Sequence, residues 1–193
     1  MFFCKRRFFS FQYHLMKVIL IRHFKVDHPW KRRCYYKEFL EDIAAYNIKP
    51  VIEPKELEFP IEKVYISTLP RTEATAKFLK GNKTIIKTAL IDEVDFSGRS
   101  RIKFRLSNTF WYLLAATKWQ FNSRRINETI KHTRKRAAEF LKLLEKNNED
   151  CIVVSHGMFL LVLMNLMTNK GYSGGVKTNR LANGQVIEME KVC

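Results

Sequence analysis

Two arginines and two histidines stand at positions where strands of the chain are predicted to end. Arg22 and His23 directly follow residues 18–21 (Val-Ile-Leu-Ile), and His156 follows a second apolar run. Arg71 lies in the predicted first turn of a helix that begins where another strand ends. Guanidinium groups match phosphate oxygens, and an imidazole nitrogen can attack phosphorus. The four residues therefore predict a phosphate site with a phosphohistidine intermediate, unless Arg22, His23 and Arg71 are ordinary surface residues.

The elements that would position these side chains alternate between strands and helices. Unbroken apolar runs predict strands buried on both faces, and apolar residues at helical spacing predict the helices between them. Thr68 is the expected N-cap of the helix that carries Arg71. Strands are expected at 18–21, 63–67, 84–88, 151–155 and 185–190, with helices at 36–46, from 68, at 126–145 and at 158–167.

Alternation of this kind favours parallel strands joined by helices. The fold class is therefore predicted to be α/β, a three-layer α/β/α sandwich with a mostly parallel central sheet. The carboxyl ends of parallel strands meet at one edge of a sheet, so the two arginines and two histidines are expected around one point. The last strand is expected to close the sheet after the turn at Asn183 and Gly184.

Four motifs occur in the order found in the histidine phosphatase superfamily, which has the phosphoglycerate mutase-like fold. They are Leu20-Ile-Arg-His, Ser67-x-x-x-Arg71-Thr-x-x-Thr-Ala76, a glutamate after the third strand, and Val154-Ser-His-Gly157. The chain resembles this superfamily from about residue 16 to residue 157. The resemblance implies that the protein is a metal-independent phosphomonoesterase that needs no organic cofactor.

The same resemblance assigns a role to each matching residue. His23 resembles the nucleophile that accepts the phosphoryl group, and Glu93 the proton donor to the leaving alcohol and later the base for water. The phosphoryl oxygens would be held by Arg22, Arg71 and His156. Asp92 and Asp95 stand beside Glu93 and are alternatives for the acid.

The sequence departs from the family pattern directly after the nucleophile. The family usually has glycine where this chain has Phe24, and the usual threonine or asparagine is replaced within Lys25-Val-Asp. Glycine lets backbone approach a phosphate, so Phe24 bears on rate and on substrate. A short run from Arg22 through Cys34-Tyr35 is similar to some alpha-ribazole phosphatases.

Length and composition favour one domain. The chain has 193 residues, 46% of them hydrophobic, which suffices for a sizeable core. A single domain is expected over 16–193, with a cap-like insertion at about 99–122. Residues 1–15 are expected to be a basic, aromatic extension with the natural start at Met16, or alternatively a weak membrane-surface anchor. Four scattered cysteines and no transmembrane segment favour a reduced cytoplasmic protein.

The net charge of +16 favours anionic partners. A small phosphorylated substrate is the expected partner, and the oligomeric state stays open. Two alternatives remain: a catalytically silent domain that binds a phosphorylated ligand, and a nucleic-acid-binding protein. The second rests on residues 99–122, where bases and aromatic residues alternate, although such a stretch is more often an amphipathic helix packed inward.

Overall fold

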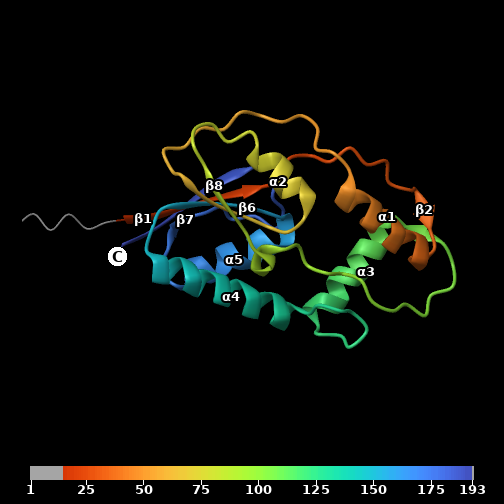
Figure 1. The fold of residues 1–193 in the computed structure, drawn as a ribbon. Coiled ribbons are helices and arrows are strands. Elements are labelled where there is room, and N and C mark those ends of the chain that lie inside the picture. The colour runs from red at the N-terminus through yellow and green to blue at the C-terminus, as the bar shows by residue number, and fades with distance from the viewer. Residues whose placement is uncertain (1–14, 193) are drawn as a thin grey trace, which may run out of the picture.

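The computed structural model describes residues 15–192 of the chain (Figure 1). The predicted extension at residues 1–15 lies outside the described residues except for Leu15. The extension and the start at Met16 both stay predictions. None of the helices in the described part combines the length and the apolar character needed to span a membrane.

A six-stranded sheet forms the centre of the structure, in the order β4-β3-β6-β1-β8-β7. The four strands β4, β3, β6 and β1 are parallel, whereas β8 runs antiparallel beside β1 and β7 runs antiparallel beside β8. The strands are β1 Leu15–Arg22, β3 Lys63–Ile66, β4 Thr84–Lys87, β6 Cys151–Ser155, β7 Ser173–Gly174 and β8 Val186–Val192. The last strand thus lies inside the sheet rather than at its edge, because β7 occupies that edge.

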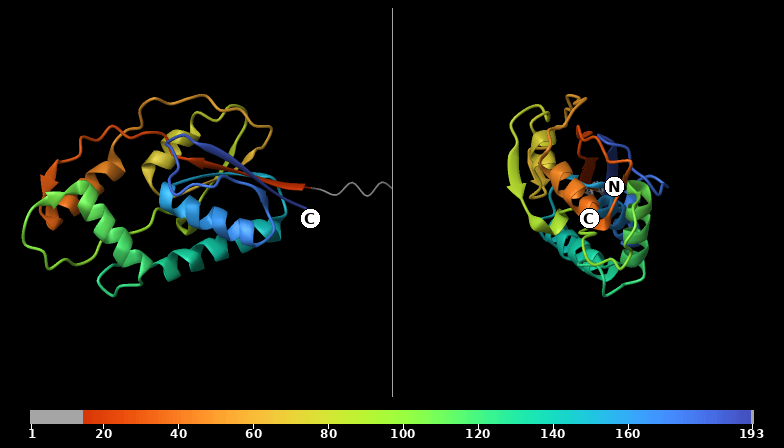
Figure 2. Two further views of the ribbon diagram at one scale, coloured as in Figure 1. Left: turned by 180° about the vertical axis from the view of Figure 1, so that it is seen from behind. Right: turned by 90° about the vertical axis from the view of Figure 1, so that its right-hand side faces the viewer.

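Helices cover both faces of this sheet, so the predicted three-layer α/β fold is confirmed. Helices α4 (Ile130–Asn147) and α5 (Gly157–Asn169) lie on one face, and α2 (Pro70–Ala76) lies on the other (Figures 1 and 2). Alternate residues of β1 point to opposite faces of the sheet and so pack against the two helical layers. Val18 and Leu20 pack with α4 and α5, while Ile19 and Ile21 pack on the side of α2.

A second group of elements lies beyond the carboxyl ends of the parallel strands (Figure 1). It comprises helices α1 (Tyr36–Ile48) and α3 (Asn108–Gln120) and a two-stranded sheet of β2 (Arg33–Cys34) and β5 (Leu106–Ser107). A short 3-10 helix, η1 (Ala89–Ile91), precedes Glu93. The extent of the insertion at about 99–122 stays a prediction, but its helical part is the single helix α3.

Helix α3 packs only one of its faces inward. Trp111, Ala115 and Trp119 are buried at helical spacing, and the indole N–H of Trp111 donates to the carbonyl of Cys34 at 2.8 Å. On the outer side, Phe110 and Leu113 are exposed. The inward face expected from the sequence is present, and an apolar outer face accompanies it.

Two predicted helix starts are wrong, each for a local reason. Thr68 is not an N-cap: its backbone N–H and its hydroxyl both donate to the Asp92 carboxylate, at 2.7 and 2.6 Å, and the helix begins at Pro70. The helix predicted from residue 126 begins at Ile130. Ile126 instead forms a bridge with Gly98, which holds its backbone extended.

Candidate active site

The structure brings the side chains singled out in the sequence to the carboxyl end of the sheet. His23 follows β1 and its backbone N–H donates to Ser155 of the neighbouring β6 at 2.9 Å. His156 is the N-cap of α5, and the centroids of the two imidazole rings are 5.2 Å apart. Arg71 is the second residue of α2. Three adjacent parallel strands thus deliver these groups to one place.

Arg71 joins the two imidazoles. Its Nε–H donates to His23 Nε2 at 3.2 Å and to His156 Nδ1 at 3.1 Å. The opposite nitrogens fix the tautomers: His23 Nδ1 lies 2.7 Å from the carbonyl oxygen of Phe24, to which it must donate. His156 Nε2 lies 2.7 Å from Ser67 Oγ, to which it donates. The lone pair of His23 is therefore on Nε2, facing the arginine.

Both imidazoles are held in the neutral form. Burial, reinforced by the charges of Arg71 and Arg22, lowers the pKa of His23 from its ordinary 6.5 to about 3. Burial and the Arg71 charge likewise lower the pKa of His156 well below 6.5. A neutral imidazole keeps a free electron pair, which a nucleophile requires.

In the described part of the chain, Arg71 forms no ion pair. Burial lowers its pKa, against the effect of the more distant Glu93, which attracts its charge and raises that pKa. Arg71 is only 3% exposed, and its hydrogen-bond acceptors are the two imidazoles and Asn47 Oδ1, at 2.6 Å from Nη1. Its guanidinium group also lies 5.1 Å from the ring centre of Tyr46. Among residues 15–192 no acidic side chain lies within ion-pair distance of it. A buried charge without a counter-ion is costly, so the site is suited to an anion.

Arg22 offers a second donor to this site. Its Nη1 donates to the carbonyl of Leu181, while its buried Nε has no partner among the described residues. The guanidinium group lies against the start of α5, where a side chain on Gly157 would come within 3.3 Å of it. Arg22 also lowers the pKa of both imidazoles. The geometry leaves one of its N–H groups available for a ligand.

Glu93 lies at the amino-terminal end of α5. Its Oε1 accepts from the backbone N–H of Phe159 at 3.2 Å and of Val94 at 3.0 Å. Burial raises the pKa of the Glu93 carboxyl above its ordinary 4.5, against the opposing effects of these two hydrogen bonds and of Arg71. A raised pKa suits a group that must give a proton.

The neighbouring acids are engaged elsewhere. Asp92 accepts both hydrogen bonds from Thr68 described above, and Asp95 accepts from Ser97 and from the Asn127 side chain. The Asp92 and Asp95 carboxylates thus stabilise loops through these hydrogen bonds. Because both are engaged in this way, Glu93 is the favoured candidate for the proton donor among the three acids.

The depressed pKa of His23 has a consequence for stability. The unfolded chain takes up a proton on His23 as the pH falls through about 6.5, whereas the folded chain does so only near 3. Between these values the unfolded state binds more protons, so stability falls as the pH falls. We expect His23→Gln to lose less unfolding free energy than the parent protein between about pH 7.5 and about pH 4.5 in urea titrations. Equal losses would show that His23 has no depressed pKa.

Phe24 occupies a site of its own beside the imidazoles. Its ring is 2% exposed and packs edge-on against Phe78, with ring centres 5.9 Å apart. A side chain on Gly184 would come within 2.8 Å of the same ring, so this glycine makes room for it. The backbone N–H of Phe24 donates to Thr75 Oγ1 at 3.0 Å. The aromatic ring thus faces Phe78 and Gly184, while the His23 ring faces Arg71.

We expect Phe24→Ala to destabilise the fold by about 3–5 kcal/mol, the usual cost of emptying a buried phenylalanine site. Denaturant unfolding followed by tryptophan fluorescence measures this. Phe121→Ala is the matched control, because Phe121 is 78% exposed and its removal should change the stability little. A loss below about 1 kcal/mol for Phe24→Ala would contradict the described packing.

Several side chains that position the site were not singled out by role in the sequence. Asn47 and Tyr46 come from α1, Ser67 orients His156, and Thr75 holds the backbone after His23. The side chain of Asn183, which is distant in sequence, donates to the carbonyl of His23 at 3.1 Å. Of these, Ser67 and Thr75 belong to the motif around Arg71, whereas the other three have no local signal.

Comparisons with known proteins agree with this architecture. The family model of the histidine phosphatase superfamily (branch 1) matches residues 55–191. A search of curated protein sequences found no match. The family match starts after residues 22–24, so it does not cover Arg22 or His23, and the role expected of His23 stays a prediction.

Solved structures share the fold at low identity. A putative alpha-ribazole-5'-P phosphatase from Escherichia coli K-12 has a TM-score of 0.59 and 14% identity, over 91% of this chain and 90% of that one. A mycobacterial glucosyl-3-phosphoglycerate phosphatase has a TM-score of 0.56 and 11% identity, over 92% and 91%. A phosphoserine phosphatase from Entamoeba histolytica, with 3-phosphoglyceric acid bound, has a TM-score of 0.51 and 18% identity, over 90% and 89%.

A parallel sheet that gathers two histidines and two arginines at its carboxyl end, together with the match over 55–191, defines the class of this protein. The chain belongs to the histidine phosphatase superfamily.

Proposed function

We propose that the protein is a phosphomonoester hydrolase that works through a phosphohistidine on His23. The observation that carries this proposal is the buried charge of Arg71, which forms no ion pair among the described residues and lies between two neutral imidazoles. A phosphoryl dianion would bring negative charge to Arg71. Both His23 Nε2 and His156 Nδ1 hold lone pairs toward this position, and we assign the attack to His23 because it stands in the motif Leu20-Ile-Arg-His. Bound phosphate oxygens would replace the two imidazole nitrogens as acceptors for Arg71.

In the first step His23 Nε2 attacks phosphorus and the bond from phosphorus to the ester oxygen breaks. Glu93 gives its proton to the departing alcohol, and burial favours the protonated form that this step needs by raising the pKa of the carboxyl. In the second step water attacks the phosphohistidine, Glu93 takes up a proton from that water, and inorganic phosphate leaves. His23 is then neutral again and the cycle closes.

Three groups would hold the phosphoryl oxygens during both steps: Arg22, Arg71 and His156. Arg22 Nε and the guanidinium of Arg71 supply donors directly. His156 can donate a hydrogen bond to a phosphoryl oxygen once Nδ1 has taken up a proton. The incoming dianion favours that protonation because it raises the pKa of the imidazole. The reaction uses only groups of the chain itself, so we propose that it needs neither metal nor cofactor.

We propose a small, anionic phosphorylated metabolite as the substrate. The structural neighbours are described as phosphatases of alpha-ribazole-5'-P, of glucosyl-3-phosphoglycerate and of phosphoserine, all small phosphorylated compounds. The excess positive charge of the chain supports the same class. Cys34 and Cys151 are buried free thiols, which fits the reducing cytoplasm that we propose as the location.

Trapping the covalent intermediate tests this function. The protein is mixed with p-nitrophenyl phosphate in the presence of EDTA, quenched during turnover, and the modified peptide is located by mass spectrometry. Phosphate on His23 is the expected result. Phosphate bound without turnover would indicate a silent binding domain, and tight salt-sensitive binding of RNA with no turnover would favour the nucleic-acid alternative.

The role of Glu93 predicts a dependence on the leaving group. Glu93→Gln cannot give a proton, so hydrolysis of an alkyl phosphate, whose alkoxide leaves poorly, should fall by about 10²-fold or more. Hydrolysis of p-nitrophenyl phosphate should fall much less, because nitrophenolate leaves without protonation. Steady-state kcat for the two substrates measures the difference.

Asp95→Asn is the matched control for this variant. Asp95 lies two residues from Glu93, and its carboxylate serves Ser97 and Asn127. Its substitution should reduce both rates by a similar factor. If Asp95→Asn showed the leaving-group dependence and Glu93→Gln did not, the acid would be Asp95.

A further inference from the structure

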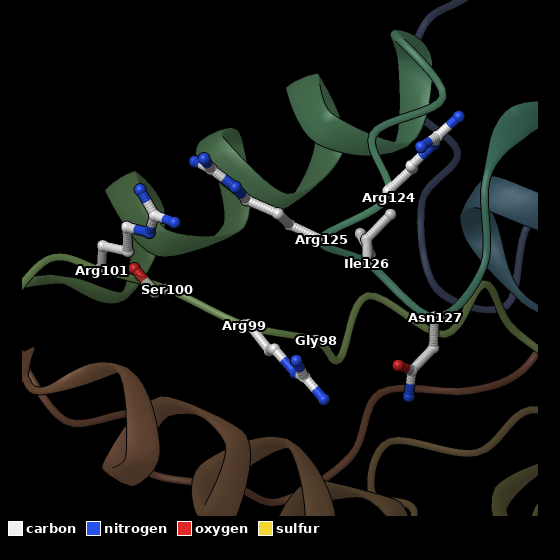
Figure 3. Close-up of a pocket in the computed structure, with 8 residues that line it drawn as sticks. All are labelled: Gly98, Arg99, Ser100, Arg101, Arg124, Arg125, Ile126 and Asn127. Atoms are coloured by element: carbon white, nitrogen blue, oxygen red, sulfur yellow. The ribbon is translucent and has the colours of Figure 1, made fainter.

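A cavity of about 800 Å³ lies outside the candidate active site, and arginines dominate its wall. Arg99 and Arg101 come from the segment that precedes β5, and Arg124 and Arg125 come from the loop between α3 and α4 (Figure 3). The remaining lining residues are Gly98, Ser100, Ile126 and Asn127. No hydrogen bond of the described residues joins the four arginines to His23, Arg71 or His156.

Backbone pairing builds this cavity. The Arg99 N–H donates to the Arg125 carbonyl at 2.8 Å, and the Asn127 N–H donates to the Ser97 carbonyl at 2.9 Å. A side chain on Gly98 would lie 2.2 Å from the Arg125 carbonyl oxygen, so only glycine allows the two segments to approach this closely. The arginines are therefore brought together by a fixed arrangement of the backbone.

The four guanidinium groups have no ionic partner in the described chain. The nearest acids in sequence are engaged: Asp95 accepts from Ser97 and Asn127, and Glu128 pairs with Arg136 at 2.8 Å. Burial lowers the pKa of Lys118, and the nearby Arg125 charge lowers it further. Like charges held together without counter-ions repel each other, so an anion bound here relieves that repulsion.

We propose that this cavity binds a small polyanion with two or more phosphate groups. Figure 3 shows the Arg101 and Arg125 side chains on one side, while those of Arg99 and Arg124 point in two other directions. Donors spread in this way match several phosphate groups better than one. Each guanidinium can hold phosphate oxygens through two parallel hydrogen bonds.

The lining also limits the class of ligand. Ile126 is the one apolar side chain among the lining residues and is itself buried, so charged and polar residues dominate the wall. The four arginines are exposed at this wall, and the volume of the cavity is within the range of small-molecule sites. An inorganic or sugar polyphosphate fits both conditions.

Calorimetric titration of the full-length protein with inorganic tripolyphosphate at low salt tests the proposal. Replacement of Arg99 and Arg125 together by glutamine should weaken binding by about tenfold or more, since each removes charged hydrogen bonds. The matched control replaces Arg32 and Arg33, two exposed arginines that line a second basic cavity. Equal weakening by both pairs would show general attraction to a basic protein and overturn the site.

Two further variants separate this site from charge alone and from the proposed catalysis. Gly98→Ala keeps every charge but forces the segments apart, so binding should weaken. Unchanged binding would overturn the proposal. His23→Ala should bind tripolyphosphate at this cavity as the parent does, whatever the outcome for turnover. Tighter binding of single-stranded RNA than of tripolyphosphate, lost with Arg99 and Arg125, would assign the arginines to a nucleic acid and overturn the small-molecule ligand.

Discussion

Replacing His23 by alanine is expected to lower kcat for p-nitrophenyl phosphate by about 10⁴-fold or more, as removal of a nucleophile does in other covalent enzymes. The reason is geometric. His23 Nε2 carries the lone pair because Nδ1 donates to the Phe24 carbonyl, and Arg71 marks where the phosphoryl group would sit. Steady-state turnover measured with EDTA present compares the variant with the parent protein.

The control for His23→Ala is His132→Ala, which removes an exposed histidine on α4 and should leave turnover unchanged. Circular dichroism establishes that both variants fold. Turnover in folded His23→Ala equal to that of the parent protein would mean that the nucleophile is another group.

Arg71→Ala is expected to lower kcat/KM by about 10³-fold, near the upper end of the effect of removing one preorganised donor. Arg71 is the common donor to His23, His156 and Asn47, so its loss removes transition-state charge stabilisation and the alignment of both rings. Its charge also helps to keep the pKa of His23 low, so that pKa should rise in the variant. Kinetics measures the first effect, and NMR titration of the imidazole resonances measures the second.

Arg71→Lys separates charge from geometry. A lysine keeps the positive charge but lacks the planar fork, so its rate should lie between those of the parent protein and Arg71→Ala. Arg134→Ala removes an exposed arginine of α4 and is the control for net charge. An Arg71→Ala variant with unchanged kcat/KM and unchanged imidazole pKa would refute the central place given to this residue.

The parts of the fold that were predictable from sequence are those with a local signal. Residues 18–21 are apolar at every position, and residues 151–155 are apolar up to the final Ser155. Such runs are typical of strands buried on both faces, and both are central strands of the sheet. Each is followed by a charged or titratable residue. The fold class and the edge of the sheet that gathers His23 and His156 were therefore within reach of sequence reasoning.

The parts that were not predictable depend on contacts between distant segments. Nothing in the sequence around Asn47 shows that its amide accepts from Arg71, because that contact exists only once α1 lies beside α2. Thr68 is of a residue type that is common at N-caps, but its hydroxyl donates a hydrogen bond to Asp92 instead. The backbone hydrogen bond between Arg99 and Arg125 likewise depends on the β-bridge between Gly98 and Ile126, which no local sequence pattern indicates.

The antiparallel pairing of β1 with β8 bears on when the chain acquires its site. Residues from the two ends of the described chain are partners, from Leu15 with Val192 to Ile21 with Val186. The turn before β8 also holds the backbone beside His23, the proposed nucleophile, since the Gly184 N–H donates to the carbonyl of Arg22. Contacts between segments so far apart in sequence form slowly. On the ribosome, a nascent chain could complete β1, β3 and β6 and still leave His23 unsecured until the last strand emerges.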